Sequence, residues 1–151
     1  MNINEEYAIE MLLSGHSHGM EIRKEYPTAF MYEAKITNPE RLDRWLLDNG
    51  YLRKPTAEET ISRYKVTELK EVLSKLGLKV SGKKAELVKR IISNLPENEI
   101  AAEMNRDKRY FLSEKGLKHY YDNIDLEELH RNWKYGIGLE RLWYFVKAYL
   151  S

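Results

Sequence analysis

The sequence predicts a mainly α-helical protein with short β segments. Apolar residues recur three or four positions apart in several stretches, as they do on one face of a helix. Residues that favour helix starts precede these stretches, and glycine or proline ends them. We expect an N-terminal helical region over 1–55, a helix–extended-loop–helix over 61–95, and a C-terminal helical region over 106–151. The first and last regions are expected to pack together.

Composition limits the class of protein. The 151 residues can bury the core of one domain or of two small ones. Because the chain has no cysteine, disulfides and thiolate zinc sites are excluded. No apolar run approaches the roughly 18 residues that a membrane helix needs, and the acidic start "MNINEEYAIE" argues against a signal peptide. We therefore expect a cytoplasmic protein without a membrane partner.

The N-terminal region contains two expected helices. "NEEYAIEMLLSG" predicts a helix that ends at Gly15. "TNPERLDRWLLDNGYL" predicts a second helix with Asn38 as N-cap, Pro39 at its first position and Gly50 at its end. One face of this helix is apolar: Leu42, Trp45, Leu46. Residues 53–60 are expected to form a polar connector.

The C-terminal region follows a proline-bearing break at residues 94–99. A short extended run over 109–112 should lead into a helix capped by Ser113. Residues 139–150 predict a strongly apolar helix, which we expect to be buried against the N-terminal part. Its aromatic neighbourhood offers a surface for a partner protein or for stacking on unpaired bases, although core packing is favoured by the helical spacing. The aromatic residues concerned are Trp133, Trp143, Tyr144 and Phe145.

Positive charge is concentrated in the middle of the chain. Residues 61–93 carry 9 basic and 3 acidic residues, whereas the rest of the chain carries 16 basic and 21 acidic ones. This asymmetry indicates a polyanionic partner, or else a solvated lysine-rich helix face.

The basic segment itself predicts two short amphipathic helices. The first has Thr67 as N-cap, stops at Gly77, and carries its apolar residues on one face: Leu69, Val72, Leu73, Leu76. In the extended loop that follows, Leu78 and Val80 alternate with Lys79 and are expected to point inward. The second helix stops at Pro96, and its apolar face comprises Leu87, Val88, Ile91, Ile92 and Leu95. Helices this short must pack against each other, since neither is stable alone.

The runs "VTELKEVLSKLGL" and "SGKKAELVKRI" resemble the SAP domain, a helix–extended-loop–helix motif of chromatin, DNA-repair and some phage proteins. The resemblance covers about residues 61–95 and leaves the flanks unassigned. It implies binding of double-stranded DNA, often A·T-rich, through backbone and minor-groove contacts. By position, the candidate DNA-binding residues are Lys70, Lys79, Gly82, Lys83, Lys84, Lys89 and Arg90. The resemblance also admits a phage or mobile-element context in a bacterium.

Lys83 and Lys84 stand where the second helix begins, which is unfavourable for folding. Many relatives have threonine at position 83, which with Glu86 would form a capping box worth roughly 0.5–2 kcal/mol. The lysines also oppose the helix dipole, at roughly a few tenths of a kcal/mol each. A phosphate group would gain from the free N–H groups and the ammonium groups together. The alternative is that Glu86 neutralises the lysines and nothing binds.

No set of residues predicts catalysis, a cofactor or a metal site. His16, His18 and Glu21 in "GHSHGME" could ligate a metal, but two histidines flanked by glycines are more typical of an exposed loop. Acidic residues are dispersed or paired at helical spacing, as Glu40 is with Arg44, while Glu10 has no such partner. We therefore expect a non-enzymatic DNA-binding protein. The alternatives are a protein–protein adaptor that uses the same motif, and a nuclease or other DNA-processing activity hidden in the flanks.

Overall fold

The computed structural model describes residues 3–23, 26 and 36–123, and it confirms the mainly helical fold class. The chain divides into two compact units. We call residues 1–53 with 109–151 the sheet unit, and Lys54–Lys108 the helical unit. The expected helix over 139–150 and the four aromatic residues at 133 and 143–145 lie outside the described residues.

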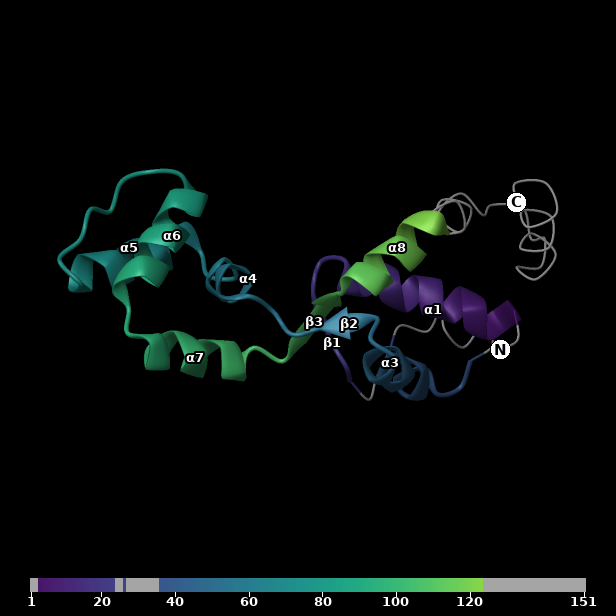
Figure 1. The fold of residues 1–151 in the computed structure, drawn as a ribbon. Helices are drawn as coiled ribbons and strands as arrows, with labels where there is room; N and C mark the ends of the chain where they lie inside the picture. The colour runs from purple at the N-terminus through teal and green to yellow at the C-terminus, as the bar shows by residue number, and fades with distance from the viewer. Residues whose placement is uncertain (1–2, 24–25, 27–35, 124–151) are drawn as a thin grey trace. The chain divides into compact units, whose positions relative to one another are not determined.

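The sheet unit combines a small antiparallel sheet with helices (Figure 1). The strands lie in the order β1-β3-β2, with Met20 opposite Tyr110 and Leu52 opposite Leu112. The described strands are β1 (Met20–Glu21), β2 (Leu52–Arg53) and β3 (Arg109–Leu112). The helices are α1 (Ile3–His16), α3 (Pro39–Asp48) and α8 (Glu114–Asp122).

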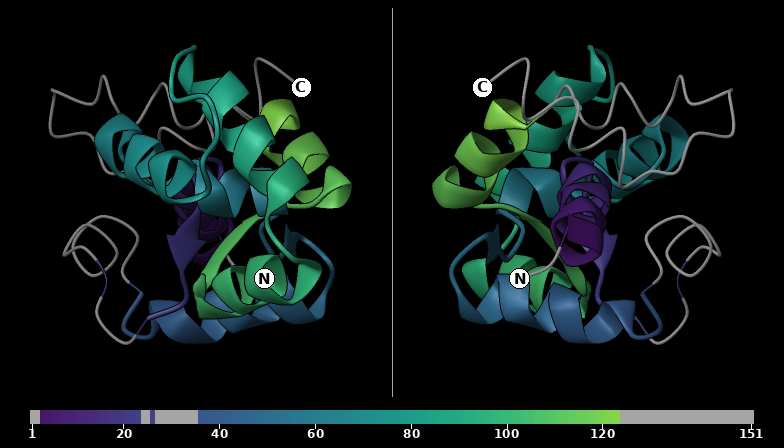
Figure 2. Two further views of the ribbon diagram at one scale, coloured as in Figure 1. Left: turned by 90° about the vertical axis from the view of Figure 1, so that its left-hand side faces the viewer. Right: turned by 90° about the vertical axis from the view of Figure 1, so that its right-hand side faces the viewer.

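Helix α1 is the centre of this unit. It contacts α3, α8 and β3, and two further views show it beside the strands (Figure 2). The buried apolar core consists of Tyr7, Ala8, Ile9, Leu12, Leu13, Leu42, Leu46, Leu52 and Leu112. Residues on both sides of the helical unit contribute to it, so the helical unit is an insertion between the neighbouring strands β2 and β3.

The short-range capping predictions for this unit are confirmed. The Asn38 side chain accepts from the N–H of Arg41 at the start of α3, with Pro39 at its first position. Ser113 accepts from the N–H of Gly116 at the start of α8, and the extended run over 109–112 is β3. Gly50 follows α3 with a φ of 81°. Trp45, expected on the buried face of α3, is 37% exposed.

The expected end of the first helix at Gly15 is wrong. Helix α1 continues to His16, and the positive φ of 84° belongs to Gly19. The side chain of Met20 packs over Gly15, where a Cβ would lie 2.7 Å from Sδ and would have to displace this flexible side chain. The backbone needs glycine at the turn after the helix, where a left-handed conformation excludes most side chains.

The interpretation of His16 as part of an exposed loop is also wrong. Its ring is fully buried, with Nδ1 2.8 Å from the carbonyl oxygen of Tyr110 and Nε2 2.6 Å from Oδ1 of Asp43. Tyr26 donates to the other oxygen of Asp43 at 2.7 Å, and burial together with this bond raises the pKa of the tyrosine. Both ring nitrogens thus face oxygen atoms, one of a backbone carbonyl and one of a carboxylate. This arrangement ties α1 to α3 and β3.

Two further contacts involve acidic residues considered above. Glu40 pairs with Arg44 at 2.9 Å, as its helical spacing predicts. Glu10 of α1 is buried and lies 2.7 Å from Nδ1 of His119 on α8. Burial lowers the pKa of His119. The partner of Glu10 therefore comes from the other end of the described chain.

The helical unit consists of α4 (Ala57–Ile61), α5 (Val66–Lys75), α6 (Lys84–Asn94) and α7 (Glu97–Arg106). Helix α6 contacts both α5 and α4, and α4 contacts α7. The buried core comprises Ile61, Leu69, Leu73, Leu87, Val88, Ile91 and Ile100. Thr60 of α4 donates to the buried carboxylate of Asp107 at 2.9 Å, which fixes the end of α7. In the part of the chain that the structure describes, no helix is long and apolar enough to cross a membrane.

We expect Asp43→Asn to destabilise the sheet unit by about 3–5 kcal/mol, because it leaves the buried His16 without its charged partner. Hydrogen exchange of the α1 amides would measure the change locally. Asp48→Asn on the same helix is the control, since Asp48 is exposed and should change stability by at most about 0.5 kcal/mol. Equal exchange rates in the two variants would show that the buried pair contributes little.

Candidate nucleic-acid interface

Helices α5 and α6 pack through a small apolar core. Leu69 and Leu73 of α5 are buried, as are Leu87, Val88 and Ile91 of α6. They lie one helical turn apart, so each helix presents one stripe to the other. The predicted scaffold is therefore confirmed for these residues.

Three other apolar predictions for this segment are wrong. Val72 is 37% exposed and Leu76 39% exposed, although both were expected on the buried face of α5. Val80 in the loop is 39% exposed, whereas Leu78 packs against the core as expected. The buried stripe of α5 is narrower than the apolar face that the sequence predicts. Among the described elements, α6 is the one that packs closely against it.

Helix α5 begins earlier than expected. Its N-cap is Lys65 rather than Thr67, which lies inside the first turn. The Glu68 carboxylate accepts from the N–H of Lys65 at 3.1 Å. This bond is one half of a capping box, and it satisfies the backbone N–H of Lys65. The other half does not form, because the lysine side chain has no acceptor atom.

The loop between α5 and α6 is held by Arg90. Gly77 ends α5 with a φ of 70°, as predicted, and the chain then runs without regular structure to Gly82. Nη1 of Arg90 donates to the carbonyl oxygens of Lys79 at 2.6 Å and Ser81 at 3.0 Å. Because these carbonyls have no helix or sheet partner, the guanidinium fixes the path of the loop.

The start of α6 has free backbone donors and no side-chain cap. Lys83 is the N-cap residue, and its side chain makes no capping hydrogen bond. Its carbonyl oxygen accepts from the N–H groups of Glu86 and Leu87. The N–H groups of Lys84 and Ala85 precede these in the first turn and have no intrahelical acceptor. Both lysine side chains are exposed.

Glu86 lies close to this helix start without pairing with the lysines. A Cβ built on Gly82 would lie 2.7 Å from Oε2 of Glu86, and Gly82 has a φ of 131°. The φ is what favours glycine at position 82, because the flexible Glu86 side chain can move away from a Cβ. Among the described residues, no ion pair joins Glu86 to Lys83 or Lys84, so the structure provides no support for neutralisation by Glu86.

The remaining candidates lie on three different elements. Lys79 is exposed in the loop, Lys70 on α5, and Lys89 on α6. Lys89 lies two residues before the buried Ile91, about 160° away around the helix, so it points to solvent. Arg90 is half-buried and faces the loop. The structure thus places Gly82, Lys83 and Lys84 at the start of α6, and Arg90 holds the loop that carries Lys79, while Lys70 lies on α5 and Lys89 further along α6.

The comparisons with known proteins identify a family for one segment of the chain. Residues 60–96 match the family model of the SAP domain. The SAP domain indicates nucleic-acid binding in general. No curated protein and no solved structure matches the chain, and the flanking regions are assigned to no family.

The helical unit extends the SAP domain at both ends. Helix α4 begins in the expected polar connector, where Thr56 and Glu59 form a complete capping box. Helix α7 follows Pro96 directly, and its Ile100 and Met104 pack on the SAP core. Sequence reasoning missed both helices, although the Thr-x-x-Glu pattern and the four-residue spacing of Ile100 and Met104 are usable signals.

The described residues contain no group of three His, Asp or Glu side chains that could hold a metal ion. His16 is engaged with Asp43 and Tyr110, while His18 is exposed in the turn after α1. The two histidines therefore point to different surroundings.

We expect Arg90→Met to loosen the loop without unfolding α6. Loss of two hydrogen bonds from a charged donor should cost about 1.5–3 kcal/mol, while the methionine keeps the apolar stem. Hydrogen exchange of the amides at residues 81–83 should become faster. Lys89→Met is the matched control, because it removes a neighbouring charge that makes no bond to the loop. If both variants exchange alike, Arg90 does not position the loop.

Proposed function

We propose that the SAP domain binds double-stranded DNA without catalysing a reaction, through phosphate contacts at the start of α6. The observation that carries the proposal is the uncapped first turn of α6, where the N–H groups of Lys84 and Ala85 lie beside two exposed lysines. A phosphate oxygen accepts from such backbone donors and is attracted by the positive end of the helix dipole. Two ammonium groups add charge at the same place.

The other helix starts of the helical unit support this interpretation. Thr56 and Glu59 form a full capping box at α4. At α5, which also starts at a lysine, Glu68 accepts from the N–H of Lys65. At α6 the residue pair with the same spacing is Lys83 and Glu86, and neither half of the box forms in the described structure. Folding alone gives no reason for two lysines at this position, whereas phosphate binding does.

The other candidates have supporting roles in the proposal. Lys79, Lys70 and Lys89 are exposed and extend the positive surface from the loop onto α5 and α6. Arg90 acts as a positioning residue, since its guanidinium is engaged with the loop carbonyls. This gives four to six phosphate contacts, for which binding should weaken with salt at a log–log slope of about −4 to −5.

Specific readout of bases is not part of the proposal. Residues 64–93 contain no asparagine or glutamine, the side chains that pair bidentately with adenine. A preference for A·T-rich duplex would come from the narrow minor groove, whose stronger negative potential attracts lysine and arginine. A phage or mobile-element context stays a prediction from the resemblance.

The direct test compares Lys83→Ala/Lys84→Ala with the wild-type chain by fluorescence anisotropy on A·T-rich and G·C-rich duplexes at several salt concentrations. We expect the affinity to fall roughly tenfold to thirtyfold, or about 1.4–2 kcal/mol, and the salt slope to become shallower by about 2. Lys75→Ala/Lys108→Ala removes the same charge from exposed positions outside the interface and should bind nearly as the wild type does.

Three results would contradict the proposal. A salt slope near zero for the wild type would exclude phosphate contacts. Equal losses in the two double variants would show that the site is elsewhere. Absence of DNA binding in the wild type would favour the adaptor function, in which the lysines contact an acidic surface of a partner protein.

Lys83→Thr should separate stability from binding. Threonine can complete the capping box with Glu86, so the helical unit should gain about 0.5–2 kcal/mol in stability. The same change removes one ammonium group from the proposed phosphate site, so DNA affinity should fall. Amide exchange in α6 and anisotropy on the same samples measure the two effects. A variant that gains stability and also binds DNA more tightly would argue against the phosphate site.

A further inference from the structure

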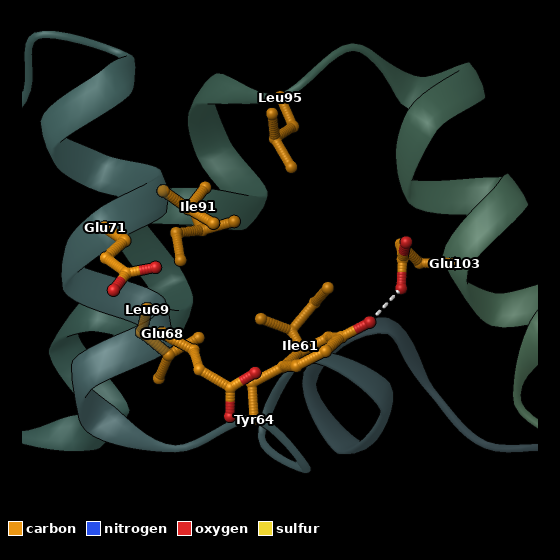
Figure 3. A pocket seen from close by; sticks show the side chains of 9 residues that line it. Ile61, Tyr64, Glu68, Leu69, Glu71, Ile91, Leu95 and Glu103 are labelled. Atoms are coloured by element: carbon orange, nitrogen blue, oxygen red, sulfur yellow. Dashed lines mark hydrogen bonds between the residues drawn. The ribbon is translucent and has the colours of Figure 1, made fainter.

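A pocket of about 300 Å³ lies on the helical unit, between α5, α6 and α7 (Figure 3). Most of its walls come from residues 61–95, which lie within the SAP match. The remaining wall is Glu103 of α7, which lies beyond that match. None of the seven candidate DNA-binding residues lines it. The pocket is therefore separate from the proposed phosphate site, and nothing in the DNA-binding proposal uses it.

The floor of the pocket is apolar. Ile61, Leu69 and Ile91 are buried core residues that form its base, and Leu95 is half-buried at one end. Val72 at the edge is one of the exposed apolar side chains of α5. A leucine-sized side chain placed here would remove apolar surface from water on both partners.

The rim of the pocket is acidic. Glu103 receives hydrogen bonds from Tyr64 and Arg63, which lower the pKa of this carboxyl, and it also pairs with Arg106. Its charge is thus compensated. Glu68 and Glu71 stand on the α5 side, where Figure 3 shows both carboxyl groups, and within the described residues neither forms an ion pair. Glu68 accepts from the N–H of Lys65 at the start of α5, so Glu71 is the carboxylate that gives the rim its uncompensated negative charge.

We propose that this pocket binds a partner polypeptide that presents a leucine-sized apolar side chain next to an arginine or lysine. The apolar side chain would lie on the floor over Ile91, and the cation would lie beside Glu71. The volume is at the small end of ligand pockets, which suits one or two side chains better than a cofactor. A nucleic acid does not fit the same chemistry, because its phosphates would face carboxylates.

The two binding sites use different flanks of α5. Lys70 precedes Val72 by two residues and so lies about 160° away around the helix. Glu68 precedes Val72 by one turn and lies on the same flank as Val72. A partner seated over Val72 therefore leaves Lys70 accessible to DNA. The partner expected here is basic, in contrast to the acidic partner that the adaptor alternative requires at Lys83 and Lys84.

The test uses the full chain and a fluorescein-labelled, alanine-based helical peptide with leucine and arginine one turn apart on one face. A second peptide has glutamate in place of each arginine. We expect the arginine peptide to bind and to shift the amide NMR signals of residues around the pocket, and the glutamate peptide to bind at least tenfold more weakly. No binding of the arginine peptide, or equal binding of both peptides, overturns the proposal.

Two variants locate the site. Glu71→Gln should weaken binding of the arginine peptide about twofold to fivefold, the effect of one exposed charge pair, and Val72→Asp should weaken it at least tenfold. Glu99→Gln, an exposed glutamate of α7 outside the pocket, should bind as the wild type does. If Glu71→Gln and Val72→Asp bind as tightly as Glu99→Gln, the peptide binds elsewhere. Amide spectra confirm that each variant is folded.

The same variants keep this proposal distinguishable from DNA binding. Lys83→Ala/Lys84→Ala should bind the arginine peptide as the wild type does and bind DNA more weakly, while Val72→Asp should do the reverse. If Val72→Asp lost both ligands with its fold intact, a single shared surface would replace the two proposed sites.

Discussion

The contacts of Arg90 with two loop carbonyls are the interaction on which the candidate interface depends. The loop from Leu76 to Gly82 lacks regular structure, so its carbonyl groups need donors from elsewhere. Arg90 supplies them from α6, beside the buried stripe in which Leu87 and Ile91 fix this helix in the core. The apolar core thus orients α6, α6 orients the guanidinium, and the guanidinium sets where the loop delivers Gly82 and Lys83. Without that chain of contacts, the lysines would sit on a loosely held segment.

The sequence predicted the features whose causes are local. Asn38, Gly77 and Ser113 were placed correctly because each acts on backbone groups within four residues. Gly15 was misjudged, since it lies inside the helix beneath the side chain of Met20 and the positive φ falls at Gly19. The burial and the partners of His16 could not be predicted either, because Asp43 and Tyr110 are 27 and 94 residues away along the chain. Spacing along the chain contains no signal for such contacts.

The candidate site was predictable to a similar extent. Helical periodicity and glycine positions indicated the hairpin and the lysines at its second helix, but not the division of roles between Lys89 and Arg90. Lys89 faces solvent and Arg90 faces the loop. These directions follow from the position of the buried stripe on α6. Helix α7 was missed because its apolar signal is short: Ile100 and Met104 lie one turn apart and pack on the core of the helical unit. With α7 absent from the prediction, the pocket beside α5 could not be foreseen either.

Net charge conceals this arrangement. The chain as a whole carries +1, and the excess of basic residues over 61–93 is offset by acidic residues elsewhere. Screening limits the reach of exposed charges to about 8–10 Å at ordinary salt, so a ligand senses the groups around its own site rather than the total. At the start of α6 these groups are Lys83, Lys84 and free N–H donors; at the pocket they are Glu68 and Glu71 over an apolar floor. The phosphate site and the pocket use different flanks of α5. DNA and a basic partner polypeptide therefore need not compete for the helical unit.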